Sequence, residues 1–170
     1  VPLFTFAGTH AMSLICLRGG MCHVLLPKFE PGRFLELLAE RKVNLAYAVP
    51  TMLVRCLDHP RIQDGGFESL HLLMYGTAPM PPWAVRDLAG HLPSTMLINL
   101  YGLTEGGVTT TLNCAENPTK WATVGKASPG CELRITGEDL KELPAGEIGE
   151  IVGRSGAMMR GYYKREDKTS

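Results

Sequence analysis

The stretch of sequence that decides the fold spans residues 70–100 and reads LHLLMYGTAPMPPWAVRDLAGHLPSTMLINL. The apolar run at 70–75 predicts a strand, the pattern at 81–91 predicts a helix, and the apolar run at 95–100 predicts a second strand. Strands separated by a helix of about 10 residues are typical of βαβ units, in which the strands are parallel. We therefore expect a sheet of parallel strands connected by helices.

The same alternation of strands and helices extends toward the N-terminus. The helix at 31–41 has its apolar side chains on one face and a proline suited to its first turn. The other expected elements are strands at 22–26 and 45–49 and helices at 8–17 and 51–57. Residues 1–120 are thus predicted to form an α/β subdomain, a mainly parallel sheet with flanking helices.

The pattern of residue types changes from about residue 121. Glycine and proline punctuate short runs of alternating side chains, with strands expected at 132–136 and 149–152. We expect residues 121–170 to form a small antiparallel β-barrel-like subdomain.

Composition excludes several classes of protein. The 170 residues include 17 Lys+Arg and 17 Asp+Glu, so the formal net charge is +0. This balance argues against binding to nucleic acid or to a membrane surface. No apolar run approaches the roughly 20 residues that a transmembrane helix needs.

Cysteine usage bears on the cellular compartment. The five cysteines are odd in number and widely spaced, with no Cys-x-x-Cys pair. Neither a disulfide framework nor a zinc site is expected, and a reducing cytoplasm fits this pattern best.

Two segments follow predicted parallel strands and are therefore candidates for a binding site. Ligands of such sheets bind at the carboxyl ends of the strands. The first segment is Gly76-Thr77-Ala78-Pro79-Met80, and the second is Tyr101-Gly102-Leu103-Thr104-Glu105-Gly106-Gly107.

The second segment, interpreted as a loop, combines residue types that suit a nucleotide. Tyr101 offers a flat face to a base, Thr104 offers a hydroxyl to a phosphate, and Glu105 offers a carboxylate to Mg²⁺. Its glycines let a ligand approach the backbone closely. The alternative interpretation is a glycine-rich turn after a strand, with Tyr101 half-buried.

Residues 101–105 resemble the Tyr-Gly-x-Thr-Glu signature of the acyl-adenylate-forming family, which includes acyl-CoA synthetases, luciferases and the adenylation domains of peptide synthetases. Other segments resemble segments of that family in the same order along the chain. They are Pro2-Leu3-Phe4, Gly76 to Met80, Thr123 to Gly130, and Gly146 to Ile151 with Met159 to Tyr163.

The resemblance implies a two-step reaction. A carboxylic acid and Mg·ATP give an acyl-adenylate, and the acyl group then passes to coenzyme A. It implies that Tyr101 stacks on adenine, that Thr104 binds phosphate and that Glu105 holds Mg²⁺, with Thr104 and Glu105 as the catalytic residues. Gly76, Thr77, Ala78, Pro79 and Gly102 would complete the ATP/AMP site, and Gly102, Gly106 and Gly107 would line the acyl pocket.

The sequence also departs from the family pattern. Thr5 stands where the family usually has a histidine, and Thr77 replaces a glycine. The family's phosphate loop, ribose-binding aspartate and catalytic lysine have no counterpart in the sequence. We expect a middle fragment of the enzyme, inactive alone, that acts on a fatty acid in the full-length protein.

Three alternatives stay open. The chain could belong to a peptide-synthetase adenylation domain, or to a non-catalytic nucleotide- or acyl-binding module of the same fold. It could also be a structural fragment that self-associates through exposed apolar faces.

Overall fold

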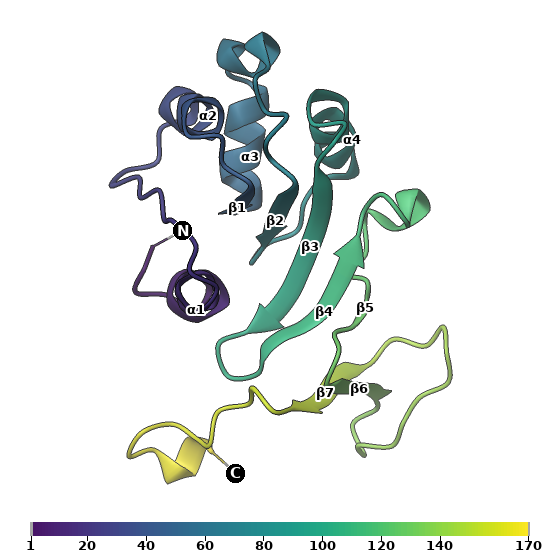
Figure 1. The fold of residues 1–170 in the computed structure, drawn as a ribbon. Helices are drawn as coiled ribbons and strands as arrows, with labels where there is room; N and C mark the ends of the chain where they lie inside the picture. Colours follow the sequence, from purple (N-terminus) through teal and green to yellow (C-terminus); the bar gives the residue numbers. More distant parts are fainter. Residues whose placement is uncertain (1, 170) are drawn as a thin grey trace.

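A five-stranded sheet organises residues 2–169, the part of the chain that this computed structural model describes (Figure 1). Its strand order is β1-β2-β3-β4-β5. The first three strands are parallel, and they are β1 (Leu45–Ala48), β2 (Leu72–Gly76) and β3 (Met96–Leu103). The predicted βαβ arrangement is therefore confirmed.

The sheet continues with two antiparallel strands that the sequence patterns did not predict. β4 (Gly107–Asn113) pairs with β3, and β5 (Lys126–Ala127) pairs with β4. The run of β-branched residues from Val108 to Thr111 would have been the sequence signal for β4.

Three helices accompany the parallel strands: α2 (Pro31–Glu40), α3 (Pro50–Leu57) and α4 (Pro82–His91). Each begins with a proline, whose missing N–H costs nothing in a first turn. The Glu30 carboxylate caps α2 by accepting hydrogen bonds from two backbone N–H groups. Figure 1 shows these helices gathered beside β1 to β3, with α3 in contact with both α2 and α4.

The hydrophobic core lies between these helices and one face of the parallel strands. Alternate strand residues point into it, as the period of two requires. The strands contribute Ala46, Ala48, Leu73, Tyr75 and Leu97, and the helices contribute Leu35, Leu53, Val85 and Leu88.

The opposite face of the parallel strands is apolar but only partly covered. Its residues have intermediate exposure, except Met96, which is 49% exposed. They are Leu45, Tyr47, Leu72, Met74, Met96, Ile98 and Leu100.

The N-terminal segment confirms one prediction and overturns another. A π-helix (Ala7–Leu14) continues into α1 (Ile15–Arg18), so the helix expected at 8–17 is present. The strand expected at 22–26 is wrong, because these residues pair with no strand in residues 2–169. Val24 is 43% and Leu25 62% exposed, so the apolar run lies on the surface.

The C-terminal part contains one antiparallel pair. β6 (Cys131–Thr136) pairs with β7 (Glu150–Ser155) in a separate sheet. Both expected strands exist, but the described residues contain no closed barrel. Short 3₁₀ helices occupy Pro60–Asp64, Pro118–Lys120 and Glu166–Lys168.

None of the helices in residues 2–169 combines the length and apolar character needed to cross a bilayer.

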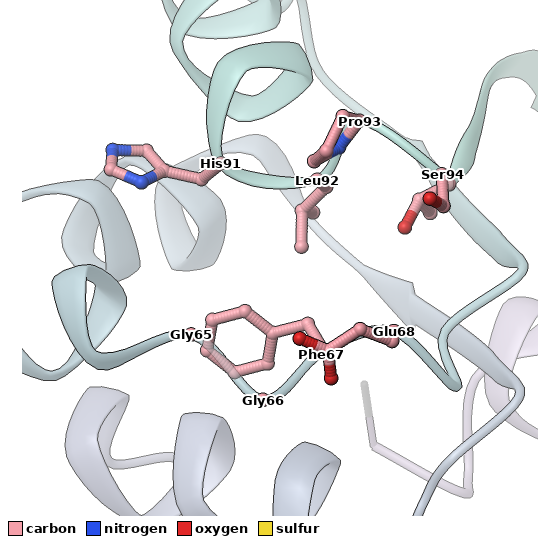
Figure 2. Close-up of a pocket in the computed structure, with 9 residues that line it drawn as sticks. Gly65, Gly66, Phe67, Glu68, His91, Leu92, Pro93 and Ser94 are labelled. Carbon is pink, nitrogen blue, oxygen red and sulfur yellow. The ribbon is translucent and has the colours of Figure 1, made fainter.

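A small cavity of about 80 Å³ lies before β2 and β3 begin (Figure 2). Figure 2 shows His91 to Ser94 on one side of it and Gly65 to Glu68 on the other. These residues precede the amino ends of the two strands, whereas ligands of parallel sheets bind at the carboxyl ends. The cavity is thus at the opposite edge of the sheet from the candidate site.

Candidate functional site

The β3–β4 hairpin carries most of the candidate residues. The segment 101–107 is not the loop that we expected: β3 continues to Leu103 and β4 begins at Gly107. Only residues 104–106 form the turn, which the Gly106 N–H closes by donating to the Leu103 carbonyl at 3.3 Å. Pairing with β4 makes these residues a strand, and a strand partner is invisible in a local sequence pattern.

Two glycines of this segment meet structural demands of the hairpin. A Cβ at Gly102 would clash with the carbonyl oxygen of Gly107. Gly107 itself has φ 72°, a left-handed conformation that favours glycine. The register also shifts between Tyr101 and Gly102, as at a β-bulge. We expected these glycines to let a ligand approach the backbone. The structure shows that the close contact between β3 and β4 itself requires them.

The segment 76–80 follows β2 and lies at the same edge of the sheet. Gly76 is the last residue of β2 and pairs in register with Leu100 of β3. The next residues along the two parallel strands are Thr77 and Tyr101. The fold therefore brings the two segments together, as their positions after neighbouring parallel strands imply.

Side chains at this edge are accessible to a ligand. Thr77, Ala78 and Pro79 are exposed, and Met80 turns back into the core. Tyr101 is 36% exposed and Thr104 is exposed, so a ring face and a hydroxyl are available. Gly106 and Gly107 are buried.

Thr77 has an unusual backbone conformation. Its φ is 72°, in the left-handed region, where a β-branched residue is an outlier. The segment therefore carries backbone strain at the position where the resembling family has glycine.

Glu105 receives a hydrogen bond from a distant part of the chain. The Tyr162 hydroxyl donates to Glu105 Oε1 at 2.6 Å. This bond lowers the pKa of the Glu105 carboxyl and raises the pKa of the Tyr162 hydroxyl. Glu105 is therefore ionised at neutral pH, as a cation ligand must be.

Two further hydrogen bonds connect the turn to the same distant segment. The Met159 N–H donates to the Glu105 carbonyl at 2.7 Å, and Ser155 Oγ donates to the Gly106 carbonyl at 3.2 Å. No site role is expected from the sequence for Ser155, Met159 or Tyr162. Met159 and Tyr162 lie in the segment 159–163, which resembles a family segment, whereas Ser155 lies outside it.

The residues present fit Mg²⁺ bound together with phosphates. Residues 2–169 contain no group of three or more His, Cys, Asp or Glu side chains placed to hold a metal ion. Mg²⁺ usually keeps several waters and binds through one or two carboxylates plus substrate phosphates. Glu105 would supply the carboxylate, and Thr104, next to it, would supply a hydroxyl to a phosphate.

Comparison with known proteins identifies the family. The sequence profile described as AMP-binding enzyme matches residues 1–163. The chain is 29% identical over 164 residues to an indoleacetate–CoA ligase of Aromatoleum aromaticum, covering 96% of this chain and 32% of that protein. It is 33% identical over 177 residues to a feruloyl-CoA synthase of Amycolatopsis, covering 99% and 34%.

The fold agrees with solved structures of similar proteins. Apo MatB from Rhodopseudomonas palustris superposes with a TM-score of 0.89 at 29% identity, covering 99% of this chain and 33% of that one. The chain spans about a third of the length of the curated relatives it matches. With the family profile and the fold in agreement, this chain belongs to the family of AMP-binding enzymes.

Proposed function

We propose that this chain carries the nucleotide-binding part of an AMP-forming acid–CoA ligase. The observation that carries the proposal is the placement of Tyr101, Thr104 and Glu105 on one hairpin, at the sheet edge shared with Gly76 to Pro79. Relatives named as CoA ligases or as an acyl-CoA synthetase support it.

The proposed reaction has two steps. The substrate carboxylate attacks the α-phosphate of ATP, which releases pyrophosphate and forms the acyl-adenylate. The thiol of coenzyme A then attacks the acyl carbonyl and displaces AMP. Catalysis of this kind depends on positioning the reactants and on stabilising charge at phosphate oxygens.

Each site residue has a role in this scheme. Tyr101 stacks on adenine, the Thr104 hydroxyl donates to a phosphate oxygen, and Glu105 binds Mg²⁺. When bound, Mg²⁺ neutralises charge on the phosphate oxygens. Gly76, Thr77, Ala78 and Pro79 form the wall beside adenine and the acyl group, and Gly102, Gly106 and Gly107 border the acyl pocket.

For the acid, we propose a fatty acid. A long-chain-fatty-acid–CoA ligase of Bacillus subtilis is 29% identical over 171 residues. Other relatives are named for indoleacetate and feruloyl-CoA, so aryl acids are the competing class.

We also propose the division into residues 1–120 and 121–170 and a cytoplasmic location. All five cysteines are free in the structure, which suits a reducing compartment.

Pyrophosphate exchange into ATP by the full-length protein tests the function. The panel should contain fatty acids of several chain lengths, indoleacetate and ferulate. We expect exchange that depends on the acid and is strongest with a fatty acid. Exchange strongest with an aryl acid would overturn the substrate, and no exchange with intact binding of an acyl-adenylate analogue would indicate the non-catalytic module.

The 170-residue chain alone should give no exchange, because it covers about a third of the length of its relatives. Its half-covered apolar sheet face should instead promote self-association, which gel filtration over a range of concentrations would detect.

A further inference from the structure

Residues 155–162 form a clasp on the tip of the β3–β4 hairpin. Three hydrogen bonds join the two: Ser155 Oγ to the Gly106 carbonyl, the Met159 N–H to the Glu105 carbonyl, and the Tyr162 hydroxyl to Glu105 Oε1. The last of these crosses 57 residues of sequence. Among the three, only the Tyr162 bond acts on a side chain of the hairpin.

Tyr162 is itself held in place by its own segment. Its backbone N–H donates to Thr169 Oγ1 at 3.1 Å, and its carbonyl accepts from the Arg165 N–H at 3.1 Å. The backbone that carries the phenol is therefore anchored on both sides. A hydroxyl on an anchored backbone can orient the group that it contacts.

Glu105 needs such orientation. It lies in a three-residue turn and is partly exposed, and the Tyr162 hydroxyl is the one side chain among residues 2–169 that donates a hydrogen bond to its carboxylate. A short bond of 2.6 Å from a phenol to a carboxylate belongs to the strong, charge-assisted class. It engages Oε1 and so restricts the direction in which the carboxylate points.

We propose that Tyr162 is a positioning residue that holds the Glu105 carboxylate in the orientation that receives the Mg²⁺ of Mg·ATP. This inference rests on the proposed function, in which Glu105 is the metal ligand. Groups that hydrogen-bond to metal ligands commonly change metal affinity about 10-fold or more when removed.

The competing explanation is that Tyr162 only fastens the clasp to the hairpin. The Ser155 and Met159 bonds already do this, and neither uses the Tyr162 side chain. Tyr162→Phe keeps the ring and both of these bonds. It therefore removes the contact to the carboxylate while leaving the attachment of the clasp.

The test measures binding of Mn²⁺, a paramagnetic substitute for Mg²⁺, by the full-length protein. Electron paramagnetic resonance reports free Mn²⁺ during titration in the presence of α,β-methylene-ATP, so no turnover is needed. The variants are Tyr162→Phe, Glu105→Gln and the double variant. Tyr163→Phe is the matched control, because Tyr163 is the neighbouring tyrosine, is 87% exposed, and as phenylalanine keeps the ring over which the Lys164 ammonium lies.

We expect Tyr162→Phe to weaken Mn²⁺ binding about 10-fold, Glu105→Gln to weaken it at least as much, and Tyr163→Phe to leave it unchanged. Because Tyr162 acts through Glu105, the double variant should bind no more weakly than Glu105→Gln.

Each other outcome overturns a definite statement. Unchanged Mn²⁺ binding in Tyr162→Phe, with a loss in Glu105→Gln, would overturn the positioning role and leave the metal role of Glu105 intact. Losses that add in the double variant would show that Tyr162 acts independently of Glu105. Unchanged binding in Glu105→Gln would overturn both the metal role and this inference.

Discussion

Gly76 ends β2 directly against the backbone of Leu100 in β3, with no room between them for a side chain. A Cβ at Gly76 would overlap the Leu100 carbonyl oxygen. Gly76→Ala should therefore force the two strands apart and destabilise the protein by about 2 kcal/mol. Since the strand ends carry the candidate site, nucleotide binding should weaken as well.

Urea denaturation measures this effect, and Gly90→Ala is its control. Gly90 lies within α4, where a Cβ would meet no other atom within 4 Å, so alanine should stabilise the helix by about 1 kcal/mol. Equal effects of the two substitutions would contradict the close approach at Gly76.

Thr77→Gly should stabilise the protein. Thr77 has φ 72°, and glycine adopts this conformation without the penalty that a β-branched residue bears. We expect a gain of about 1 kcal/mol in the free energy of unfolding, reduced by the greater freedom of glycine in the unfolded chain. Thr77→Ala keeps a Cβ and should gain less, and a loss of stability in Thr77→Gly would show that Thr77 is not strained.

Tyr101→Ala should weaken binding of an acyl-adenylate analogue by about 5- to 150-fold, because a stacked base contributes roughly 1–3 kcal/mol. Calorimetric titration of the full-length protein measures the affinity, and Tyr101→Phe, which keeps the ring face, should bind nearly as well as the wild type. A weakening of equal size in both variants would rule out stacking as the role of Tyr101.

The ion pair between Glu132 and Arg154 predicts a pH dependence of stability. The two residues face each other across β6 and β7, and two guanidinium nitrogens of Arg154 each donate to the carboxylate at 3.0 Å. This contact lowers the pKa of Glu132 below its ordinary value. A depressed carboxyl pKa stabilises the folded state above the unfolded pKa, and the effect is lost as pH falls through the folded pKa.

Thermal unfolding of the wild type and of Glu132→Gln over a range of pH measures the stability that the Glu132–Arg154 ion pair contributes. The wild type should be slightly more stable at about pH 7, and the difference should vanish once the pH falls below the lowered pKa of Glu132. Glu147→Gln is the control, because the Glu147 carboxylate forms no ion pair within residues 2–169. A difference that grows as pH falls would contradict the role of the pair.

Cys22 should react with a thiol reagent much faster than Cys56 does. Burial raises the pKa of the Cys56 thiol to about 12, so its thiolate is scarce at neutral pH, whereas Cys22 is exposed. Iodoacetamide at about pH 8 should label Cys22 and leave Cys56 intact until the protein unfolds, as peptide mass spectrometry would show. Rapid labelling of Cys56 in the native protein would mean that the packing around α3 is open.

Local sequence patterns were sufficient for much of the fold. The apolar runs and prolines around α2, β1, α3, β2 and α4 predicted these elements within a few residues. The resemblance to the family could also be recognised from the sequence alone, because it depends on short segments such as Tyr101 to Glu105. Helical periodicity and capping are properties of neighbouring residues, so the sequence alone contains them.

Strand pairing and long-range contacts were decided only by the tertiary structure. The apolar run at 22–26 finds no partner strand in the described residues, whereas Tyr101 to Leu103 become strand because β4 pairs with them. The bond from Tyr162 to Glu105 joins residues 57 positions apart and depends on the path of the chain between them. A paired strand or a hydrogen bond of this kind needs a second segment that folding brings close. A pattern of neighbouring residues does not specify which segment that is.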